Sequence, residues 1–388
     1  MFKKITVGAF ALCLAVFFVL VFLMPTDERA EMKENRPMAE MPAFTWDSLF
    51  SGEFATDFEA FLSDNVGFRA TFTDIGSRIA KLRGINLAAK DQLITLSNGT
   101  RLALEGGRIM EVFAEAPTQR EAYVSAINGI ADIIPEGTSA YLMLVPTQIE
   151  FDTSSYASLA DSQKDTIDAV YGALDGIVGV NVYDRLAESA DEYIYFRTDH
   201  HWTQRGAYHG YAALMEAMGE EAVPLSEMKH GSLDGFLGYL YNQANVSEYA
   251  QYADTIEYFM PGENYAVEAK IIEFGELVEY GARIYYTPEV GGAISYGVFM
   301  GSDHPFAKVT TNVANGKTAL VIKDSYANAL LPFLTSHYQT VVIVDPRSYY
   351  GTLSDVFAEY EVDDVIIINY AFSTANEIFI DAIEGITK

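Results

Sequence analysis

The stretch Ala319-Leu-Val-Ile-Lys-Asp-Ser-Tyr-Ala-Asn-Ala-Leu-Leu-Pro-Phe333 decides the fold. Its first four residues are a short apolar run that predicts a buried parallel strand, and residues 326–333 have the character of a helix. Ser325 therefore lies at the carboxyl end of a strand, beside backbone N–H groups of a helix start that can stabilise a developing oxyanion. Because open α/β sheets bind their ligands at such strand ends, we expect Ser325 to face a functional crevice.

The alternation of strand and helix extends outward from this stretch. Further short apolar runs, closed by turn or polar residues, lie at Tyr141–Val145, Val178–Val182, Val341–Val344 and Val365–Ile368. Helix-like segments separate most of them, at 161–174, 206–218 and 353–360. This βαβ order predicts an α/β fold with a doubly wound, mainly parallel sheet.

Residues from about 228 to 315 have a different character. They are rich in Tyr, Gly and β-branched residues, with strand-like runs at Ile284–Tyr286 and Ile294–Phe299. Such a composition favours antiparallel strands over crossover helices. We therefore expect a β-rich insertion in the sheet domain.

The composition is that of a folded, acidic chain. Of its 388 residues, 54 are Asp or Glu and 25 are Lys or Arg, so the formal net charge is −29. No basic patch is expected that could displace counterions from DNA or RNA, which excludes a nucleic-acid partner. Cys13 is the only cysteine and lies in the apolar N-terminal stretch, so the folded part has neither a disulfide nor a Cys-ligated metal site.

The N-terminus predicts a membrane anchor. Lys3 and Lys4 precede an uncharged run, Ile5–Met24, which as a helix would reach about 30 Å, the thickness of a bilayer's hydrocarbon core. A cleaved signal peptide is the alternative, but the run exceeds the usual ~7–15 apolar residues and no clear small-x-small site follows it. By the positive-inside rule the remainder lies outside the cytoplasm. We expect a single-pass anchor in the cell membrane over residues 1–24, a proline-punctuated stalk over 25–45, and an extracytoplasmic domain over 46–388.

A second segment, Thr198-Asp-His-His-Trp-Thr203, places three ionisable groups before a helix with Thr203 as its N-cap. A serine hydroxyl is a poor nucleophile unless a base takes its proton and a carboxylate orients that base. Asp199, His201 and Ser325 could meet this need. No Gly-x-Ser-x-Gly occurs in the sequence, which excludes the nucleophile elbow of the α/β-hydrolases.

Four motifs in this order resemble the DHHW family, which is related to periplasmic alginate O-acetyltransferases with an SGNH-hydrolase-like domain. They are Glu34-Asn-Arg-Pro37, Thr198-Asp-His-His-Trp-Thr203, Ile322-Lys-Asp-Ser-Tyr-Ala-Asn328 and Val344-Asp-Pro-Arg-Ser-Tyr-Tyr350. The resemblance implies a Ser-His-Asp site that moves acetyl groups on an extracellular polysaccharide, often beside a membrane-bound O-acyltransferase that supplies the acyl group. It carries the acid and the base onto Asp199 and His201, and the nucleophile onto Ser325.

The resemblance also implies a strand order and further site residues. An SGNH sheet starts with its nucleophile strand, whereas here the strands before Asp199 and His201 come first, so the order is circularly permuted. Asn369, at the end of the run Val365–Ile368, then takes the place of the oxyanion-hole Asn. The remaining expectations are that Arg347 binds an anionic sugar or the acyl oxygen, that His200 packs or contacts substrate, and that Trp202 and Tyr350 offer rings for a sugar face.

Two residues beside Ser325 have structural interpretations, and two alternative functions remain for the chain. Asp324 is read as a helix cap and Lys323 as a solvent-facing lysine. One contrasting function is a non-catalytic polysaccharide-binding or assembly protein on the same fold, with a degenerate Asp-His-Ser set. The other is a metal-dependent hydrolase using Asp199, His200, His201 and His209, although no HExxH or comparable spacing supports it. We expect no cofactor, and transfer to a sugar and hydrolysis by water both remain open.

Overall fold

The structure is a computed structural model that describes residues 41, 42, 44, 54, 58, 61, 91–96, 98–261, 265–273, 276–286 and 294–388. The chain divides into two compact units, Met1–Ala89 with Tyr241–Ala250, and Lys90–Leu240 with Gln251–Lys388. The expected anchor, residues 1–24, lies outside the described residues, and of the expected stalk only Met41, Pro42 and Phe44 are described. Within the described part of the chain, no helix has the length and apolarity needed to cross a bilayer.

The second unit is built on an eight-stranded sheet with the order β5-β4-β13-β11-β12-β10-β8-β9. The first five strands run parallel to one another, which confirms the mainly parallel α/β core. β10, β8 and β9 extend it as antiparallel strands. The bounds are β4 Ser139–Val145, β5 Val178–Gly179, β8 Tyr265–Glu273, β9 Glu276–Ala282, β10 Phe306–Thr311, β11 Thr318–Lys323, β12 Thr340–Val344 and β13 Asp364–Tyr370.

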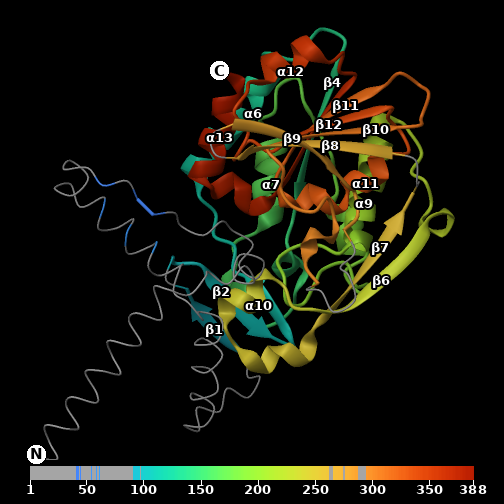
Figure 1. Ribbon diagram of the computed structural model, residues 1–388. Coiled ribbons are helices and arrows are strands. Elements are labelled where there is room, and N and C mark those ends of the chain that lie inside the picture. The colour runs from blue at the N-terminus through green and yellow to red at the C-terminus, as the bar shows by residue number, and fades with distance from the viewer. Residues whose placement is uncertain are drawn as a thin grey trace, which may run out of the picture. The chain divides into compact units, whose positions relative to one another are not determined.

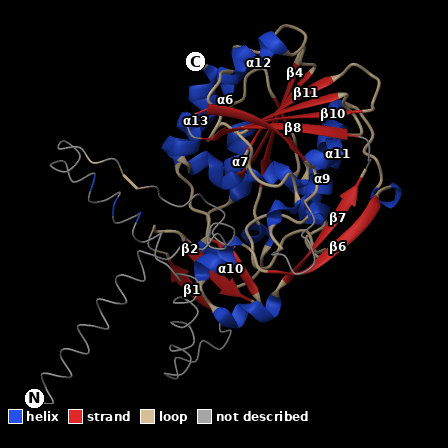
Figure 2. Cartoon of the chain, in the orientation of Figure 1, coloured by secondary structure: helices blue, strands red, loops and turns tan. Residues whose placement is uncertain are grey.

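Helices cover both faces of this sheet (Figures 1 and 2). Along β11, Leu320 and Ile322 pack on the side of α6, α7, α12 and α13, while Ala319 and Val321 pack on the side of α9 and α11. Such a two-residue alternation is required when both faces of a strand are buried. The helices are α6 Pro117–Ala131, α7 Gln163–Tyr171, α8 Tyr183–Glu188, α9 Gln204–Met218, α10 Tyr239–Ala244, α11 Leu331–Leu334, α12 Leu353–Glu359 and α13 Glu377–Thr387.

The expected β-rich insertion is present, but part of it belongs to the main sheet, because β8, β9 and β10 continue that sheet. Two of its strands, β6 (Lys229–Phe236) and β7 (Asp254–Met260), form a separate antiparallel ribbon. A small antiparallel sheet precedes the main sheet in the chain and consists of β1 Gln92–Thr95, β2 Arg101–Glu105 and β3 Arg108–Glu111. The short 3₁₀ helices are η1 Gln148–Phe151, η2 Ala157–Leu159, η3 Leu225–Glu227, η4 Ser247–Tyr252, η5 Tyr296–Val298, η6 Ser325–Ala329 and η7 Ala371–Ala375.

Three local expectations are wrong. The helix expected at 326–333 is the 3₁₀ helix η6 followed by α11, with Pro332 at the start of α11, because proline has no N–H to continue a helix through it. The strand expected at Val178–Val182 is paired only over Val178–Gly179. The strand-like run Ile294–Phe299 contains the 3₁₀ turn η5, and within it only Phe299 pairs as a strand residue, in an antiparallel bridge with Tyr285.

Candidate active site

Ser325 begins η6 directly after β11, and Asp324 holds this turn. One Asp324 carboxylate oxygen accepts the Tyr326 N–H at 2.9 Å, and the other accepts the Tyr370 N–H and the Ser373 hydroxyl, each at 2.9 Å. Asp324 is buried, and burial raises the pKa of its carboxyl. The expectation that Asp324 caps the following helix is confirmed. The cap leaves Ser325 partly exposed at the strand end.

Asp199 and His201 lie in a tight loop whose ends are tied together. The Phe196 N–H donates to the His201 carbonyl at 3.2 Å, and the Thr203 N–H donates to the Ile194 carbonyl at 2.9 Å. The Thr203 side chain accepts the Gly206 N–H, so Thr203 is the N-cap of α9, as expected. The loop is therefore fixed to a helix start on one side and closed on itself on the other.

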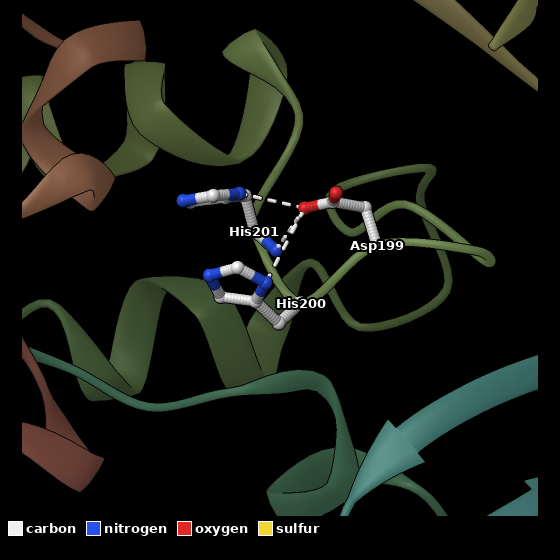
Figure 3. Close-up of side chains that lie close together, drawn as sticks. All are labelled: Asp199, His200 and His201. Atoms are coloured by element: carbon white, nitrogen blue, oxygen red, sulfur yellow. Dashed lines mark hydrogen bonds and ion pairs between the residues drawn. The ribbon is translucent and has the colours of Figure 1, made fainter. Parts of the chain in front are cut away.

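The three expected residues form one hydrogen-bonded chain. His201 Nδ1 lies 2.6 Å from Asp199 Oδ1, and His201 Nε2 lies 2.8 Å from Ser325 Oγ. An ionised carboxylate can only accept, so the imidazole proton resides on Nδ1 and Nε2 has a free lone pair. Nε2 is then placed to accept the Ser325 proton. Figure 3 shows the His201 ring extending from the Asp199 carboxylate with Nε2 on its far side.

The environment keeps the Asp199 carboxyl ionised. Asp199 is 4% exposed, and burial alone would raise its pKa, but His201 and the Tyr239 N–H lower the pKa below its ordinary value. Asp199 Oδ2 accepts the Tyr239 N–H at 2.7 Å, and Oδ1 also accepts the His201 N–H at 3.0 Å. These backbone donors fix the carboxylate in the plane that His201 needs.

His200 lies against the base, as expected for a packing residue. Its ring centroid is 3.9 Å from that of His201, and Figure 3 shows the two rings beside each other on the same side of Asp199. Burial lowers the pKa of His200, and the neighbouring His201 lowers it further. Its carbonyl accepts the Tyr326 hydroxyl. The substrate contact suggested for His200 stays a prediction.

The cluster of Asp199, His200 and His201 offers one ligand atom each within 4.8 Å, which could suit a metal ion. Two ligands of one tetrahedral zinc ion at ~2.0–2.1 Å from the metal are about 3.3 Å apart. The Asp199–His201 separation of 2.6 Å is shorter and matches a hydrogen bond. The His209 ring lies 3.9 Å from Glu192 and is not part of the cluster. The spacing fits a hydrogen-bonded set rather than a metal centre.

Two expected substrate-binding residues are buried. The Trp202 indole is fully buried and donates to the Tyr326 carbonyl at 2.8 Å, so its expected role as a sugar platform is wrong. Asn369 is also fully buried. Its amide accepts the Tyr123 hydroxyl at 2.7 Å and donates to the Ile368 carbonyl at 2.8 Å, an arrangement that gives no support to an oxyanion role. Tyr350 is 77% exposed, and its sugar contact stays a prediction.

A charge network surrounds Lys323, the last residue of β11. Lys323 is 1% exposed, so the expectation that it faces solvent is wrong; its Nζ lies 2.5 Å from Asp303 and 3.2 Å from Asp345. Arg347 pairs with the same two carboxylates, at 2.9 Å to Asp303 and 2.8 Å to Asp345. Burial would lower the pKa of Arg347, but these acids raise it above its ordinary value. Arg347 therefore uses Nε and Nη2 on Asp303 and Asp345, while its side chain stays 38% exposed, so its contact with an anionic sugar or the acyl oxygen stays a prediction.

Two residues that touch the site, Gly238 and Tyr296, were not among the predicted site residues. A Cβ on Gly238 would lie 2.2 Å from the Asp199 Cβ, so only glycine fits there. The ring of Tyr296 stacks on His201, with centroids 3.8 Å apart and planes at 5°. Neither residue lies in a motif, and no local signal marks them because their importance depends on distant partners.

Comparisons with known proteins identify the family and the fold. A model of the DHHW protein family matches residues 100–344, more than half of the chain. A solved DHHW family protein from Eubacterium siraeum DSM 15702 is 25% identical, with a TM-score of 0.67 over 76% of this chain and 97% of that one. Two structures of PatB1 from Bacillus cereus, one with a sulfonyl adduct, are 18% identical; their TM-scores are 0.61 and 0.58 over 75% of this chain and 99% of theirs. No curated protein sequence gives a match.

Proposed function

Because the chain belongs to the DHHW family, we propose that it is an acyl-transfer enzyme, an O-acetyltransferase or acetylesterase acting on a cell-surface or secreted polysaccharide. The observation that carries the proposal is the hydrogen-bonded chain from Asp199 through His201 to Ser325. A buried carboxylate, an oriented imidazole and a partly exposed hydroxyl are what nucleophilic acyl transfer requires.

The proposed reaction has two halves. Ser325 Oγ attacks the carbonyl carbon of an acetyl donor while His201 Nε2 takes the hydroxyl proton, and the imidazolium then gives that proton to the departing oxygen. The acetyl group is now an ester of Ser325. In the second half, an incoming hydroxyl loses its proton to His201 and attacks the ester; the bond to Ser325 Oγ breaks, the imidazolium returns the proton to Oγ, and the acetyl group leaves on the incoming oxygen. If the hydroxyl belongs to a sugar the result is transfer; if it belongs to water the result is hydrolysis.

The backbone supplies one donor for the tetrahedral intermediate. The Ser325 N–H is the first of η6 and makes no backbone hydrogen bond within the described part of the chain. An N–H in this position can donate to the oxyanion that forms on the attacked carbonyl. This supports a role for the Ser325 amide, whereas the Asn369 amide is held inside the core.

The strand order supports a circularly permuted SGNH sheet. β11, which carries Ser325, has β12 on one side and β13, β4 and β5 in succession on the other. Counting from β11, this is the order 2-1-3-4-5 of a flavodoxin-like doubly wound sheet. The last two strands of that count, β4 and β5, come first in the chain among the strands of this sheet. Entering the same sheet at a different strand would give this arrangement.

The proposal includes a cellular arrangement. Residues 1–24 anchor the chain in the cell membrane, and the sheet domain lies on the extracytoplasmic side, near a membrane-bound O-acyltransferase that relays the acyl group. Protease added to intact spheroplasts should then degrade the sheet domain, and carbonate washing should leave the chain in the membrane. Protection from the protease would contradict the orientation.

The experiment that tests the chemistry compares variants of the full-length chain on a chromogenic acetyl ester. Ser325→Ala and His201→Ala should each lower kcat/KM by a factor on the order of 10⁴ or more, because members of such a set act as a unit. Ser336→Ala is the matched control, since Ser336 is likewise partly exposed but lies after α11. Equal turnover by Ser325→Ala and the parent would discard the mechanism.

A covalent probe separates the enzyme from the non-catalytic alternative. A sulfonyl fluoride should react at Ser325 Oγ, forming a sulfonate ester and releasing fluoride while His201 takes the proton. Mass spectrometry of the peptide that contains Ser325 measures the adduct, which should be absent in Ser325→Ala and slow to form in His201→Ala. A chain that binds acetylated polysaccharide but neither turns over the ester nor forms the adduct would be the binding protein.

Product analysis distinguishes transfer from hydrolysis. The full-length chain is incubated with the acetyl ester and a soluble oligosaccharide, and acetate and acetylated sugar are quantified together. Acetylated sugar that rises with acceptor concentration at the expense of acetate indicates a transferase. Acetate alone at every acceptor concentration indicates an esterase.

A further inference from the structure

The imidazole of His201 is enclosed between two rings. On one face lies Tyr296, with ring centroids 3.8 Å apart and an interplanar angle of 5°. On the other lies His200, at 3.9 Å and 36°. His201 is 2% exposed and Tyr296 7%, so water does not solvate the faces of the imidazole. Whatever stabilises a charge on this ring must come from the protein.

Tyr296 is held rigidly in this position. Phe196 and Phe299 meet its ring edge-on, with centroids 6.3 and 5.4 Å away. Its hydroxyl donates to the Tyr326 carbonyl at 3.4 Å, on the residue next to Ser325. Burial raises the pKa of Tyr296 well above its ordinary value, with a further contribution from Asp199. The ring is therefore a neutral phenol whose face is fixed against the base.

The proposed reaction charges His201 twice, once in each half. An imidazolium ring is attracted to the electron-rich face of an aromatic ring, and the attraction is stronger where water is excluded. We propose that Tyr296 is a positioning residue of the acyl-transfer site, whose ring face stabilises the imidazolium of His201 and fixes its plane. This inference rests on the proposed function, because only acyl transfer through Ser325 requires that imidazolium.

The groups around His201 can accommodate a positive charge on its imidazole ring. Asp199 lies at 2.6 Å on the loop itself, and from η6 the Tyr326 ring lies 5.1 Å away and the Ser325 hydroxyl 2.8 Å away. From η5 comes Tyr296, and the described carboxylates that act on it are Asp199, Asp303 and Asp324. His200 is the only imidazole in ring contact with His201 among the described residues, and burial disfavours its charged form. His201 therefore has a negative partner, an aromatic face and no neighbouring cation in contact.

The test replaces the ring face and leaves the catalytic residues in place. In the full-length chain, Tyr296→Leu removes the aromatic face, and Tyr296→Phe keeps the face but removes the hydroxyl. Tyr296→pentafluorophenylalanine keeps a six-membered aromatic ring of similar size but reverses its quadrupole. Tyr211→Leu is the matched control, because Tyr211 is also a fully buried, stacked tyrosine but its partner is Phe333.

Two measurements are made on each variant. NMR follows the ring signals of the six histidines as the pH is changed, with His201 assigned by its absence in His201→Gln. The acetyl ester assay gives the pH profile of kcat/KM, whose acid limb reports the protonation of the base. The NMR readout needs no catalysis, so it tests the ring contact even if the proposed function fails.

The expected result follows from losing a cation–π contact. Tyr296→Leu and the pentafluoro variant should move the His201 titration midpoint and the acid limb to lower pH by about one unit. They should also lower plateau kcat/KM about tenfold, because a less stable imidazolium raises the barrier. Tyr296→Phe should stay within about threefold of the parent, since it keeps the face. Tyr211→Leu should leave the His201 midpoint where it is.

Contrary outcomes are equally clear. An unmoved His201 midpoint in the folded pentafluoro variant overturns the inference, and that variant decides if Tyr296→Leu does not fold. Loss of activity in Tyr296→Phe as large as in Tyr296→Leu also overturns it, because the hydroxyl would then be what matters. A shifted midpoint in a chain without Ser325-dependent turnover keeps the ring contact and discards only the proposed function.

Discussion

Replacing Asp199 with Asn is the sharpest test of the site because it barely changes the shape. One carboxylate oxygen of Asp199 faces His201 Nδ1 and the His201 N–H, and the other faces the Tyr239 N–H. An amide has one oxygen and one NH₂ group. If its oxygen faces His201, the NH₂ meets the Tyr239 N–H; if its oxygen faces Tyr239, the NH₂ meets two donors on His201. Either orientation sets donor against donor.

The magnitude of this effect follows from the distance between the charges. Two unit charges about 4 Å apart, at an effective dielectric constant of ~20, attract by about 4 kcal/mol, which the imidazolium loses in Asp199→Asn. At about 1.4 kcal/mol per factor of ten, kcat/KM should fall about a thousandfold. If the amide NH₂ faces His201, the loss is larger. The imidazole proton then moves to Nε2, and a protonated Nε2 cannot accept the Ser325 proton.

The assay is kcat/KM for the acetyl ester between pH 5 and 9, flanked by circular dichroism to show that the fold is kept. Because His201 lowers the pKa of Asp199 below its ordinary value, the carboxylate of the parent stays ionised throughout that range. The acid limb of the parent therefore belongs to the base and not to Asp199. A folded Asp199→Asn that keeps activity within about tenfold of the parent would refute the electrostatic role assigned to Asp199.

Three further outcomes are expected. Gly238→Ala should displace Asp199 and lower kcat/KM at least tenfold, since the new Cβ would lie 2.2 Å from the Asp199 Cβ, while Gly129→Ala, with open space around its Cβ, should not. Lys323→Met should lower the free energy of unfolding in urea by about 3–5 kcal/mol, because it removes the buried cation between Asp303 and Asp345 and leaves Arg347 alone to balance both carboxylates; a loss below ~1 kcal/mol would contradict this. Chelation with EDTA should leave kcat/KM unchanged, whereas a loss that zinc restores would support the metal-dependent hydrolase.

The core of the fold was predictable because its signal is local. Each buried strand is a short apolar run, and alternate residues of β11 face the two helical layers. Pro332 was an equally local signal for the end of η6, and the helix predicted at 326–333 overlooked it. What a residue's neighbours in the sequence determine could be read from the sequence.

The side chains whose positions were predicted wrongly or not at all are placed by residues far away in the chain. A lysine is usually exposed, and nothing beside Lys323 indicates that Asp303, twenty residues earlier, would bury it. Tyr296 lay in a run that predicted a strand, and only the folded chain brings it against His201. The side on which the Asn369 side chain lies could have been predicted from the sequence. Strand alternation puts Asn369 on the same face of β13 as Ile367, and there it contacts Tyr123 of α6.

The convergence of Ser325 and His201 depends on residues adjacent to both. They are separated by 124 positions, and their loops follow different elements, α8 and β11. Trp202, which follows His201, donates its indole N–H to the carbonyl of Tyr326, which follows Ser325. Tyr326 in turn donates its hydroxyl to the carbonyl of His200, which precedes His201. Two hydrogen bonds between flanking residues thus hold the two loops together. The distance between the Ser325 hydroxyl and the His201 imidazole is therefore set by groups that take no part in the chemistry. Trp202 makes one of these two hydrogen bonds, which explains why it is buried. A ring that binds a sugar would instead have to be exposed.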